Sequence, residues 1–373
     1  MKYRLLGRTN LEVSEISLGT EWLEKKQEAN ITTVIQEAMN QGINYFDIIY
    51  NFKNYLKKIS KAIGTKREDI VLTHHLGSSE YKGKYKKNRT INSTIEHFET
   101  YLDIMNTSYV DIAFIHFVHT STEFDECWKE GGVKDLALDL QNEGKIQHIG
   151  MSTHRMGDAI RAVKSGIIDV IMIQINLANH GHPLRQEMLK TCANNGVGVV
   201  VMKPFAGGKL LKANRTVSFA KYQTANYSRP KQKLSENITS NQCIHYILNQ
   251  VGVSTVVPGA ANLDELKDCL SYNQATETEK DYSYLLKEFE DYQEGECVYC
   301  NHCQPCPADI DIGPMFRLYD QVQGPTNEKF KSQYSQFKAK ASDCILCESC
   351  LDRCPFDIPV IEKMKEVAAF FEK

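Results

Sequence analysis

The sequence predicts an α/β protein: a (β/α)8 barrel of the TIM type with an N-terminal hairpin, followed by a small α-helical domain. Three observations support this prediction. The chain has 373 residues, which suits a barrel of about 250 residues plus an appendage. Short apolar runs alternate eight times with amphipathic stretches. Eight of the twelve cysteines lie close together near the C-terminus.

Residues 1–15 are typical of a hairpin, because two short segments flank a Gly-Arg-Thr-Asn turn. Eight strand candidates follow, each with a helix candidate after it. Ile and Val occupy both faces of these runs, as in buried parallel strands. We expect strands at 16–20, 45–50, 70–75, 110–118, 146–154, 170–176, 197–204 and 255–259.

The helices between these strands carry clear start and stop signals. Three begin near Asn30, at 155–158 and at Pro183, and they end before Gly42, Gly166 and Gly196. Strict alternation favours a closed barrel. An open doubly wound sheet is the alternative, but no Gly-X-Gly-X-X-Gly follows the first strand.

Two segments interrupt the alternation after strand candidates. Residues 78–90 form a polar loop with five basic residues, and residues 207–239 form a second polar loop. Both follow the carboxyl ends of strands, where barrel active sites lie. The basic loop is either a solvated surface or a rim that attracts an acidic substrate or an acidic redox partner. Residues 276–293 predict a charged helix, and we expect domains at 1–285 and 286–373.

Composition excludes several classes of protein. The net charge is −3, which gives no sign of a nucleic-acid partner. No apolar run reaches the ~18 residues of a membrane span, and the N-terminus has no apolar signal core. We therefore expect a cytoplasmic protein. Clustered cysteines in a cytosolic chain indicate metal binding and not disulfides.

The cysteine spacing is the strongest signal in the sequence. The first motif is C-X2-C-X2-C-X2-C-P from Cys297, and the second is C-X2-C-X2-C-X3-C-P from Cys344. The second has the spacing of bacterial ferredoxins with two [4Fe–4S] clusters, in which the fourth Cys ligates the other cluster. Two zinc sites of four cysteines each are the alternative, but such sites use separated Cys-X-X-Cys pairs. We expect one cluster on Cys297, Cys300, Cys303 and Cys354, and the other on Cys344, Cys347, Cys350 and Cys306.

The remaining cysteines lack such spacing. We expect Cys127, Cys192, Cys243 and Cys269 to be buried structural thiols.

The barrel half resembles the aldo/keto reductases over nearly its whole length. The resemblance rests on YRLLGRT at 3–9, GINYFD at 42–47, YVDI at 109–112, GKIQHIGMS at 144–152 and VVMKPFAGG at 200–208. With its Cys-rich tail, the whole chain resembles the ferredoxin-bearing branch of that family.

This resemblance implies a catalytic Asp, Tyr, Lys and His, of which two are present. Asp47 and His116 stand at the family's Asp and His positions, at the ends of the second and fourth strands. Phe52 occupies the Tyr position and His74 the Lys position. Because Phe cannot donate a proton, the family's acid chemistry is lost as usually built.

A histidine is our candidate for the missing proton donor, because imidazole titrates near neutrality. We expect His75, or its neighbour His74, to handle the proton, with His116 positioning the substrate and Asp47 setting a histidine tautomer or holding a charge. Strand alternation should turn one of the two neighbours into the helix layer, and we favour His75 for the site. Tyr50 and Tyr55 are alternative donors.

The resemblance also implies a nicotinamide site, which this chain matches in part. The matching cofactor-binding residues are Ser152, Gln174, Lys203, Gly207, Gly208, Gly259 and Asn262. Thr153 replaces the usual Asn, and Cys269 stands where an Asn would meet adenine. Glu265 stands where an Arg would meet the 2′-phosphate of NADP, and a carboxylate repels a phosphate. The glycine loops still suit a phosphate.

Histidines are frequent near the predicted barrel mouth. They are His74, His75, His116, His119, His154, His180 and His182. Seven at one rim favour a functional cluster over isolated structural residues. A bound metal is an alternative, although acidic ligands are few there.

These observations predict an iron–sulfur oxidoreductase that passes electrons between two [4Fe–4S] clusters and a small-molecule substrate or cofactor at the barrel mouth. Clusters move single electrons whereas nicotinamides move hydride, so coupling the two requires a group that does both, such as a flavin, or a substrate that itself takes single electrons. A nicotinamide nucleotide and a flavin are the two candidate cofactors of the barrel. Two alternatives are an electron-transfer protein whose barrel docks a redox partner protein, and an NAD-dependent carbonyl reductase with structural clusters.

Overall fold

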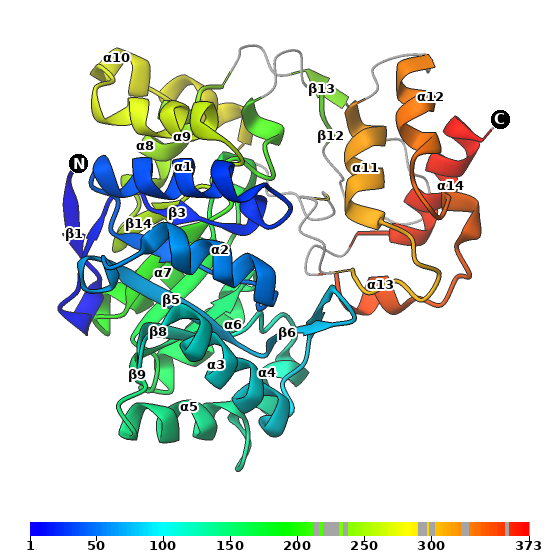
Figure 1. The fold of residues 1–373 in the computed structure, drawn as a ribbon. Coiled ribbons are helices and arrows are strands. Elements are labelled where there is room, and N and C mark those ends of the chain that lie inside the picture. Colours follow the sequence, from blue (N-terminus) through cyan, green and yellow to red (C-terminus); the bar gives the residue numbers. More distant parts are fainter. Residues whose placement is uncertain are drawn as a thin grey trace. The chain divides into compact units, whose positions relative to one another are not determined.

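The computed structural model describes residues 1–211, 216–218, 231–233, 238–289, 297, 303–321, 328–354 and 358–372. The chain divides into two compact units. The first is Met1–Leu211 with Asn237–Tyr292, and the second is Lys212–Glu236 with Gln293–Lys373. Figure 1 shows both units as a ribbon coloured along the sequence. The boundary at residue 285 stays a prediction.

The first unit is a nearly closed parallel barrel, as predicted. The eight strands follow one another around the sheet in chain order. Isolated parallel bridges, Ile16 to Val256 and Gly19 to Gly259, join the first strand region to the last. The strands are β3 (Leu18–Gly19), β4 (Tyr45–Asp47), β5 (Val71–Leu76), β8 (Val110–Ile115), β9 (Ile146–Thr153), β10 (Val170–Gln174), β11 (Gly198–Met202) and β14 (Val253–Val257).

Amphipathic helices alternate with the strands and cover the barrel (Figure 1). In α1, Ile31, Val34, Ile35 and Ala38 are buried, which is the i, i+3, i+4, i+7 pattern of a helix with one face on a core. The helices are α1 (Glu28–Asn40), α2 (Lys53–Ile63), α3 (Ile91–Met105), α4 (Ser121–Trp128), α5 (Val133–Asn142), α6 (Met156–Lys164), α7 (Arg185–Asn194), α8 (Ser240–Leu248) and α9 (Leu263–Leu270). The helices expected near residues 30, 155 and 183 correspond to α1, α6 and α7.

The N-terminal hairpin closes the amino end of the barrel. Strands β1 (Tyr3–Leu5) and β2 (Glu12–Ser14) pair antiparallel around a short 3-10 turn, as predicted. Leu6 between them is buried in one cluster with Val71 and Val170, which begin their strands. Gly7 has φ +56°, and a Cβ there would lie 2.2 Å from the backbone nitrogen of Gly198. The opposite, carboxyl end is therefore the end left for a site.

The basic segment at 78–90 was predicted as a loop, and this prediction was wrong. It forms a β-hairpin in which β6 (Ser78–Tyr81) pairs antiparallel with β7 (Lys84–Lys87). Lys82 and Gly83, between the strands, have φ of 51° and 74°. Two successive positive φ values make the tight turn whose twist matches that of paired strands. The density of lysines hid this pattern in the sequence.

The single charged helix predicted for 276–293 is divided. Its described part contains α10 (Glu277–Lys280) and a 3-10 helix, η7 (Ser283–Phe289). The Asp281 carboxylate accepts a hydrogen bond from the backbone nitrogen of Ser283, and such local bonds compete with helix continuation.

The second unit is small and helical in its described part. It contains α11 (Ile312–Gln321), α12 (Glu328–Ser335), α13 (Ser349–Asp352), α14 (Val360–Phe371) and the paired short strands β12 (Thr216–Ser218) and β13 (Lys231–Lys233). Met315, Phe316, Met364 and Val367 form its core. Most of the predicted loop at 207–239 lies outside the described residues. Within the described chain, no helix combines the length and apolarity needed to cross a membrane.

Candidate functional site

Three of the four predicted catalytic residues meet at the carboxyl end of the barrel. Asp47 is the last residue of β4, His75 is next to last in β5, and His116 directly follows β8. These strands are neighbours in the sheet, so their carboxyl ends bring the side chains together.

Hydrogen bonds join these residues in a line. His75 Nε2 lies 2.9 Å from Asp47 Oδ1, and His75 Nδ1 lies 3.1 Å from His116 Nδ1. On its other side, His116 Nε2 lies 2.6 Å from the hydroxyl of Tyr85. Thr73 also donates to Asp47 Oδ1, at 3.1 Å. Both ring nitrogens of each histidine are therefore engaged.

Burial keeps the inner part of this line away from water. The exposed fraction of both His75 and His116 is 1%, and the His75 ring stacks on Phe114. Burial lowers the pKa of His116 well below its ordinary value, and the nearby His75, Arg89 and Lys87 lower it further. These effects favour the uncharged form of His116.

His74 lies apart from this group. Its ring packs against Phe98 and Tyr101 of α3, with centroid distances of 5.2 and 4.6 Å. Successive strand residues point to opposite faces, so His75 faces the barrel interior and His74 the helix layer. Among the described residues, neither ring nitrogen of His74 has a hydrogen-bond partner, and burial lowers its pKa strongly. His74 is therefore placed as a packed core residue, which is the alternative that strand alternation predicted for one of the two neighbours.

The two tyrosines considered as substitute donors point elsewhere. The hydroxyl of Tyr55 donates to the backbone oxygen of Thr20, at 3.1 Å, and the hydroxyl of Tyr50 donates to Glu21 Oε1, also at 3.1 Å. Burial raises the pKa of Tyr50 well above its ordinary value, and Glu21 raises it further.

Tyr85 is the residue that sequence reasoning missed. It belongs to β7, and its ring lies 5.6 Å from that of Tyr50. Once the segment is known to be a hairpin, the pattern Lys84-Tyr85-Lys86 explains its placement, because alternate residues of a strand face the same side. The sequence alone gave no reason to pair β7 with β6.

The hairpin that carries Tyr85 is attached to the barrel by charged groups. Arg89 donates to the backbone oxygen of His116, at 2.9 Å, and Lys87 pairs with Glu123 of α4. His119 Nδ1 lies 2.7 Å from the same carboxylate. Burial, with Arg89 nearby, lowers the pKa of Lys87 to about 8. Two of the five basic residues of this segment are therefore structural.

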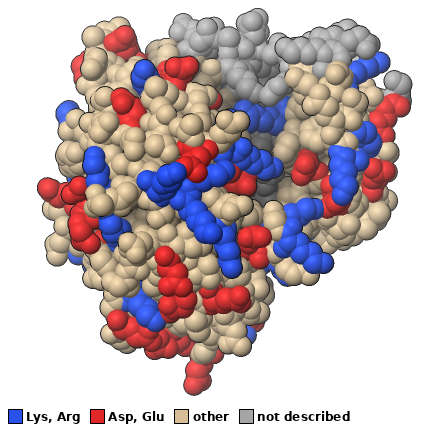
Figure 2. Space-filling view, in the orientation of Figure 1, with Lys and Arg blue, Asp and Glu red and all other residues tan. Residues whose placement is uncertain are grey.

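The other three basic residues of the hairpin, Lys82, Lys84 and Lys86, are exposed. Figure 2 shows further Lys and Arg side chains over α2, whose Lys53 and Lys57 are also exposed. This basic surface suits an acidic substrate or partner, which stays a prediction.

The residues expected to hold a nicotinamide lie at the same end of the barrel. Ser152 is near the end of β9, where its hydroxyl accepts from the backbone nitrogen of Phe117 at 2.8 Å. Gln174 ends β10, and its Oε1 is buried without a partner among the described residues. Lys203 follows β11 with Nζ 3.2 Å from His154 Nε2. Gly207 and Gly208 come next, with φ of 68° and 81°.

The loop after β14, expected to hold a phosphate, already binds a carboxylate of this chain. Glu265 Oε2 accepts from the backbone nitrogen of Ala261 at 2.8 Å, and Asn262 caps α9 by accepting from the backbone nitrogen of Glu265. A Cβ at Gly259 would lie 2.3 Å from Trp22 Cδ1. An amide that could bind phosphate thus faces a negative charge instead.

The remaining mouth histidines do not converge on one point. His119 and His154 flank Phe117, while His180 lies 2.9 Å from the hydroxyl of Tyr246. His182 Nδ1 accepts from the backbone nitrogen of Leu184. Across the part of the chain that the structure describes, no three His, Cys, Asp or Glu side chains, the motif cysteines included, form a group that could hold a single metal ion.

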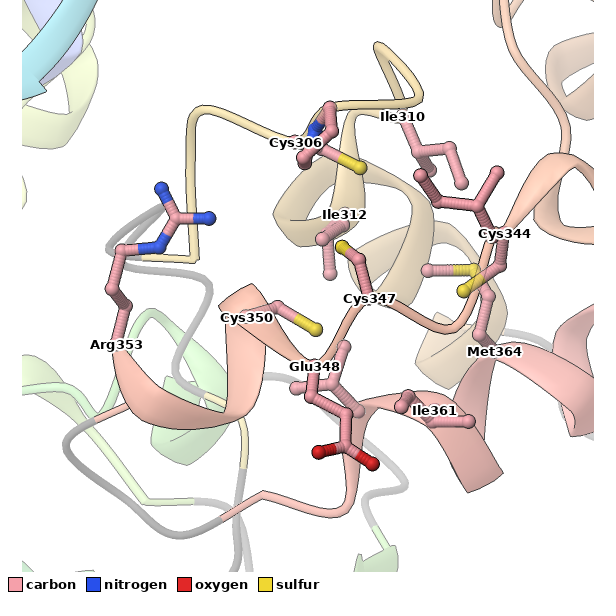
Figure 3. A pocket seen from close by; sticks show the side chains of 13 residues that line it. Cys306, Ile310, Ile312, Cys344, Cys347, Glu348, Cys350, Arg353, Ile361 and Met364 are labelled. Carbon is pink, nitrogen blue, oxygen red and sulfur yellow. The ribbon is translucent and has the colours of Figure 1, made fainter.

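In the second unit, four of the motif cysteines line one pocket. They are Cys306 of the first motif and Cys344, Cys347 and Cys350 of the second. Figure 3 shows their sulfur atoms turned toward the same space, with Ile310, Ile312 and Met364 around them. This is the ligand set expected for one of the two clusters.

The first motif is described only in part. Cys297, Cys303 and Cys354 are partly buried against the core of the second unit, and Cys300 lies outside the described residues. The expectation for the other thiols is confirmed, since Cys127, Cys192, Cys243 and Cys269 are all buried and free of disulfides.

A parallel barrel with titratable side chains gathered at the carboxyl ends of its strands has the architecture of a (β/α)8 enzyme. Comparison with family models identifies which one. Residues 15–288 match the model of the aldo/keto reductase family, and the chain belongs to that family of oxidoreductases.

Several proteins of known sequence are similar to the barrel part of this chain. The uncharacterized oxidoreductase YqkF of Bacillus subtilis is 24% identical over 284 residues, which are 72% of this chain and 90% of that protein. The L-glyceraldehyde 3-phosphate reductase of Escherichia coli K12 is 25% identical over 232 residues, which cover 56% of this chain and 63% of that protein. The structure of aldo-keto reductase AKR11C1 from Bacillus halodurans matches this structure with a TM-score of 0.62 at 24% sequence identity. The match covers 78% of this chain and 100% of that one.

Proposed function

We propose that this chain is an iron–sulfur oxidoreductase in which two [4Fe–4S] clusters exchange electrons with a small molecule bound at the barrel mouth. The observation that carries the proposal is the pocket lined by Cys306, Cys344, Cys347 and Cys350. Cys306 lies 38 residues before Cys344 in the sequence, so the fold unites the fourth Cys of one motif with three of the other, as in two-cluster ferredoxins.

The residues around this pocket suit such a cluster. Ile310, Ile312, Val360, Ile361 and Met364 supply the apolar part of its lining, beside the charged Glu348 and Arg353. Apolar neighbours, charge and solvent exposure all influence the reduction potential of a cluster. When bound, [4Fe–4S] clusters supply single electrons.

At the barrel mouth the chain supplies acid–base chemistry. Phe52 and His74 stand where the family has its Tyr and Lys, so proton transfer falls to the group of Asp47, His75 and His116. These three are hydrogen-bonded and largely buried. Histidine side chains are suitable groups for moving protons near pH 7.

The cofactor at the mouth is the second question. Gln174 Oε1, buried and without a partner among the described residues, suits a carboxamide, which favours a nicotinamide ring. Glu265 disfavours NADP binding, because its carboxylate accepts a hydrogen bond from the backbone amide of Ala261 in the expected phosphate loop. An NAD-dependent carbonyl reductase with structural clusters is therefore the second candidate function. In its support, this chain is 26% identical over 230 residues to an NADH-specific methylglyoxal reductase of Escherichia coli.

Anaerobic purification tests the main proposal. We expect about eight iron and eight sulfide per chain, with an absorption band that bleaches on reduction by dithionite. The reduced clusters should then be reoxidised by a substrate of the barrel. Stoichiometric zinc with little iron would refute the proposal. The second candidate would be favoured if neither carbonyl compounds nor a flavin reoxidised the reduced clusters while the protein still reduced carbonyl compounds with NADH.

A further inference from the structure

When both histidines are neutral, the line of hydrogen bonds from Tyr85 to Asp47 has a single consistent direction. A carboxylate only accepts hydrogen bonds, and a neutral imidazole has one N–H donor and one bare acceptor nitrogen. Asp47 Oδ1 already accepts from Thr73 and lies 2.9 Å from His75 Nε2. A neutral His75 must therefore carry its proton on Nε2, which leaves its Nδ1 bare.

The same rule fixes the next two members. A bare His75 Nδ1, 3.1 Å from His116 Nδ1, requires the proton of His116 to be on Nδ1. His116 Nε2 is then bare and accepts from the hydroxyl of Tyr85, 2.6 Å away. Every donor thus points inward, from the hairpin toward the carboxylate of β4.

We propose that Tyr85, His116, His75 and Asp47 form a proton relay in which the hydroxyl of Tyr85 is the acid–base group facing the substrate. The proposal deepens the proposed function, since it assumes a substrate whose reacting oxygen gains or loses a proton at the barrel mouth. It assigns His116 to the relay, because both of its ring nitrogens are engaged within it.

The transfer balances as one proton. When the substrate oxygen releases a proton, Tyr85 takes it and passes its own to His116 Nε2. His116 passes its Nδ1 proton to His75 Nδ1, and His75 passes its Nε2 proton to Asp47. The reverse sequence, starting from a protonated Asp47, delivers one proton to the substrate oxygen. No electrons move in these steps, and each O–H or N–H bond broken is matched by one formed.

Tyr85 is the member placed to meet a substrate. His75 and His116 are buried, whereas Tyr85 is partly exposed. The residues that follow Tyr85 are anchored, since the hydroxyl of Ser79 donates to the backbone oxygen of Lys86 at 2.7 Å, and Arg89 donates to the backbone oxygen of His116. Tyr85 thereby replaces, from a different element, the phenol that Phe52 lacks.

Nuclear magnetic resonance of the full-length protein tests the relay without a substrate. With 15N-labelled histidine and 13Cζ-labelled tyrosine in the oxidised protein, His75 should show the Nε2–H tautomer and His116 the Nδ1–H tautomer. Assignments come from His75→Phe and Tyr85→Phe, which keep aromatic packing. Wild-type protein showing His116 as Nε2–H, or as a charged imidazolium at pH 7, overturns the relay.

Coupling along the line gives a second measurement. In His75→Phe, the Nδ1–H of His116 loses its acceptor, so His116 should change to Nε2–H and the Tyr85 signal should shift. Asp47→Ala should shift the Tyr85 signal in the same way, from three hydrogen bonds away. Tyr81, on the same hairpin and 57% exposed, is the matched control and should not shift. A Tyr85 signal unchanged in both variants would show that Tyr85 is not coupled to Asp47.

These outcomes are separable from the fate of the proposed function. Protein with full clusters and the wrong tautomers rejects the relay alone, whereas the predicted tautomers in a protein that binds no iron reject only the proposed electron transfer.

Discussion

Glu123 is predicted to hold the hairpin that carries Tyr85, and Glu123→Gln tests this with almost no change in shape. The carboxylate pairs with Lys87, Arg89 and His119. Removing one partner of a fully buried ion pair costs about 3–5 kcal/mol. The Glu123 side chain is 22% exposed, so we discount this to about 2–3 kcal/mol.

Hydrogen exchange followed by mass spectrometry measures this cost where it arises. The hairpin can open locally, so its amides report local stability better than a global melting curve does. A loss of about 2–3 kcal/mol corresponds to exchange roughly 30- to 150-fold faster in peptides covering residues 78–90. Strands of the barrel interior should exchange at the wild-type rate.

The matched control is Glu126→Gln on the same helix. Its ion pair with Lys129 is exposed by 63% and 60%, and such pairs contribute at most about 1 kcal/mol. Hairpin exchange should therefore change by less than about fivefold. Equal exchange in Glu123→Gln and the control would refute the argument that this buried charge cluster fixes the hairpin.

Three further predictions follow from the two units. If the motif cysteines hold two [4Fe–4S] clusters with crossed fourth ligands, as proposed, Cys347→Ala should remove the one in the pocket of Figure 3 and lower iron from about eight to about four or fewer per chain. Cys269→Ala, which changes a buried thiol outside the motifs, should keep the full iron content. NADPH should bind no more tightly than NADH in a fluorescence titration because Glu265 occupies the phosphate loop, and Glu265→Arg should shift the preference toward NADPH; strong NADPH preference in the wild type would contradict this. Burial lowers the pKa of His74, so the unfolded chain binds a proton below about pH 6.5 that the folded chain excludes. Stability is therefore retained above that pH and falls below it, by about 1.4 kcal/mol per pH unit for this group; urea unfolding of His74→Phe should show a shallower decline between pH 6.5 and 5 than the wild type does.

A substrate would allow a direct assay of the mouth. Tyr85→Phe should then lower kcat by about 10²- to 10⁴-fold, as expected for loss of a general acid, while Tyr81→Phe keeps the wild-type rate. Full turnover in Tyr85→Phe would leave the hydroxyl without a catalytic role.

Much of the fold could be predicted because its signals are local. Apolar runs, N-caps and C-terminal glycines mark strands and helices within a few residues, so all eight barrel strands were found. The rule that barrel strands end on one face placed Asp47, His75 and His116 together before any distance was known. Alternation within β5 limited the choice between His74 and His75.

Other features depended on contacts between distant segments. Tyr85 lies 31 residues before His116, and only the pairing of β7 with β6 turns it toward that ring. Nothing in the local sequence distinguishes Glu123, which pairs with Lys87 of the hairpin, from Glu126, which pairs with the exposed Lys129.

The sequence by itself therefore determined the barrel, its active end and the cysteine motifs, because periodicity and spacing are properties of the chain. Only the tertiary structure decided which side chains complete the site. The direction of the line from Tyr85 to Asp47 comes from four groups on four separate elements. In their neutral forms the two histidines constrain each other's tautomers, and such mutual constraint exists only once the elements have packed together.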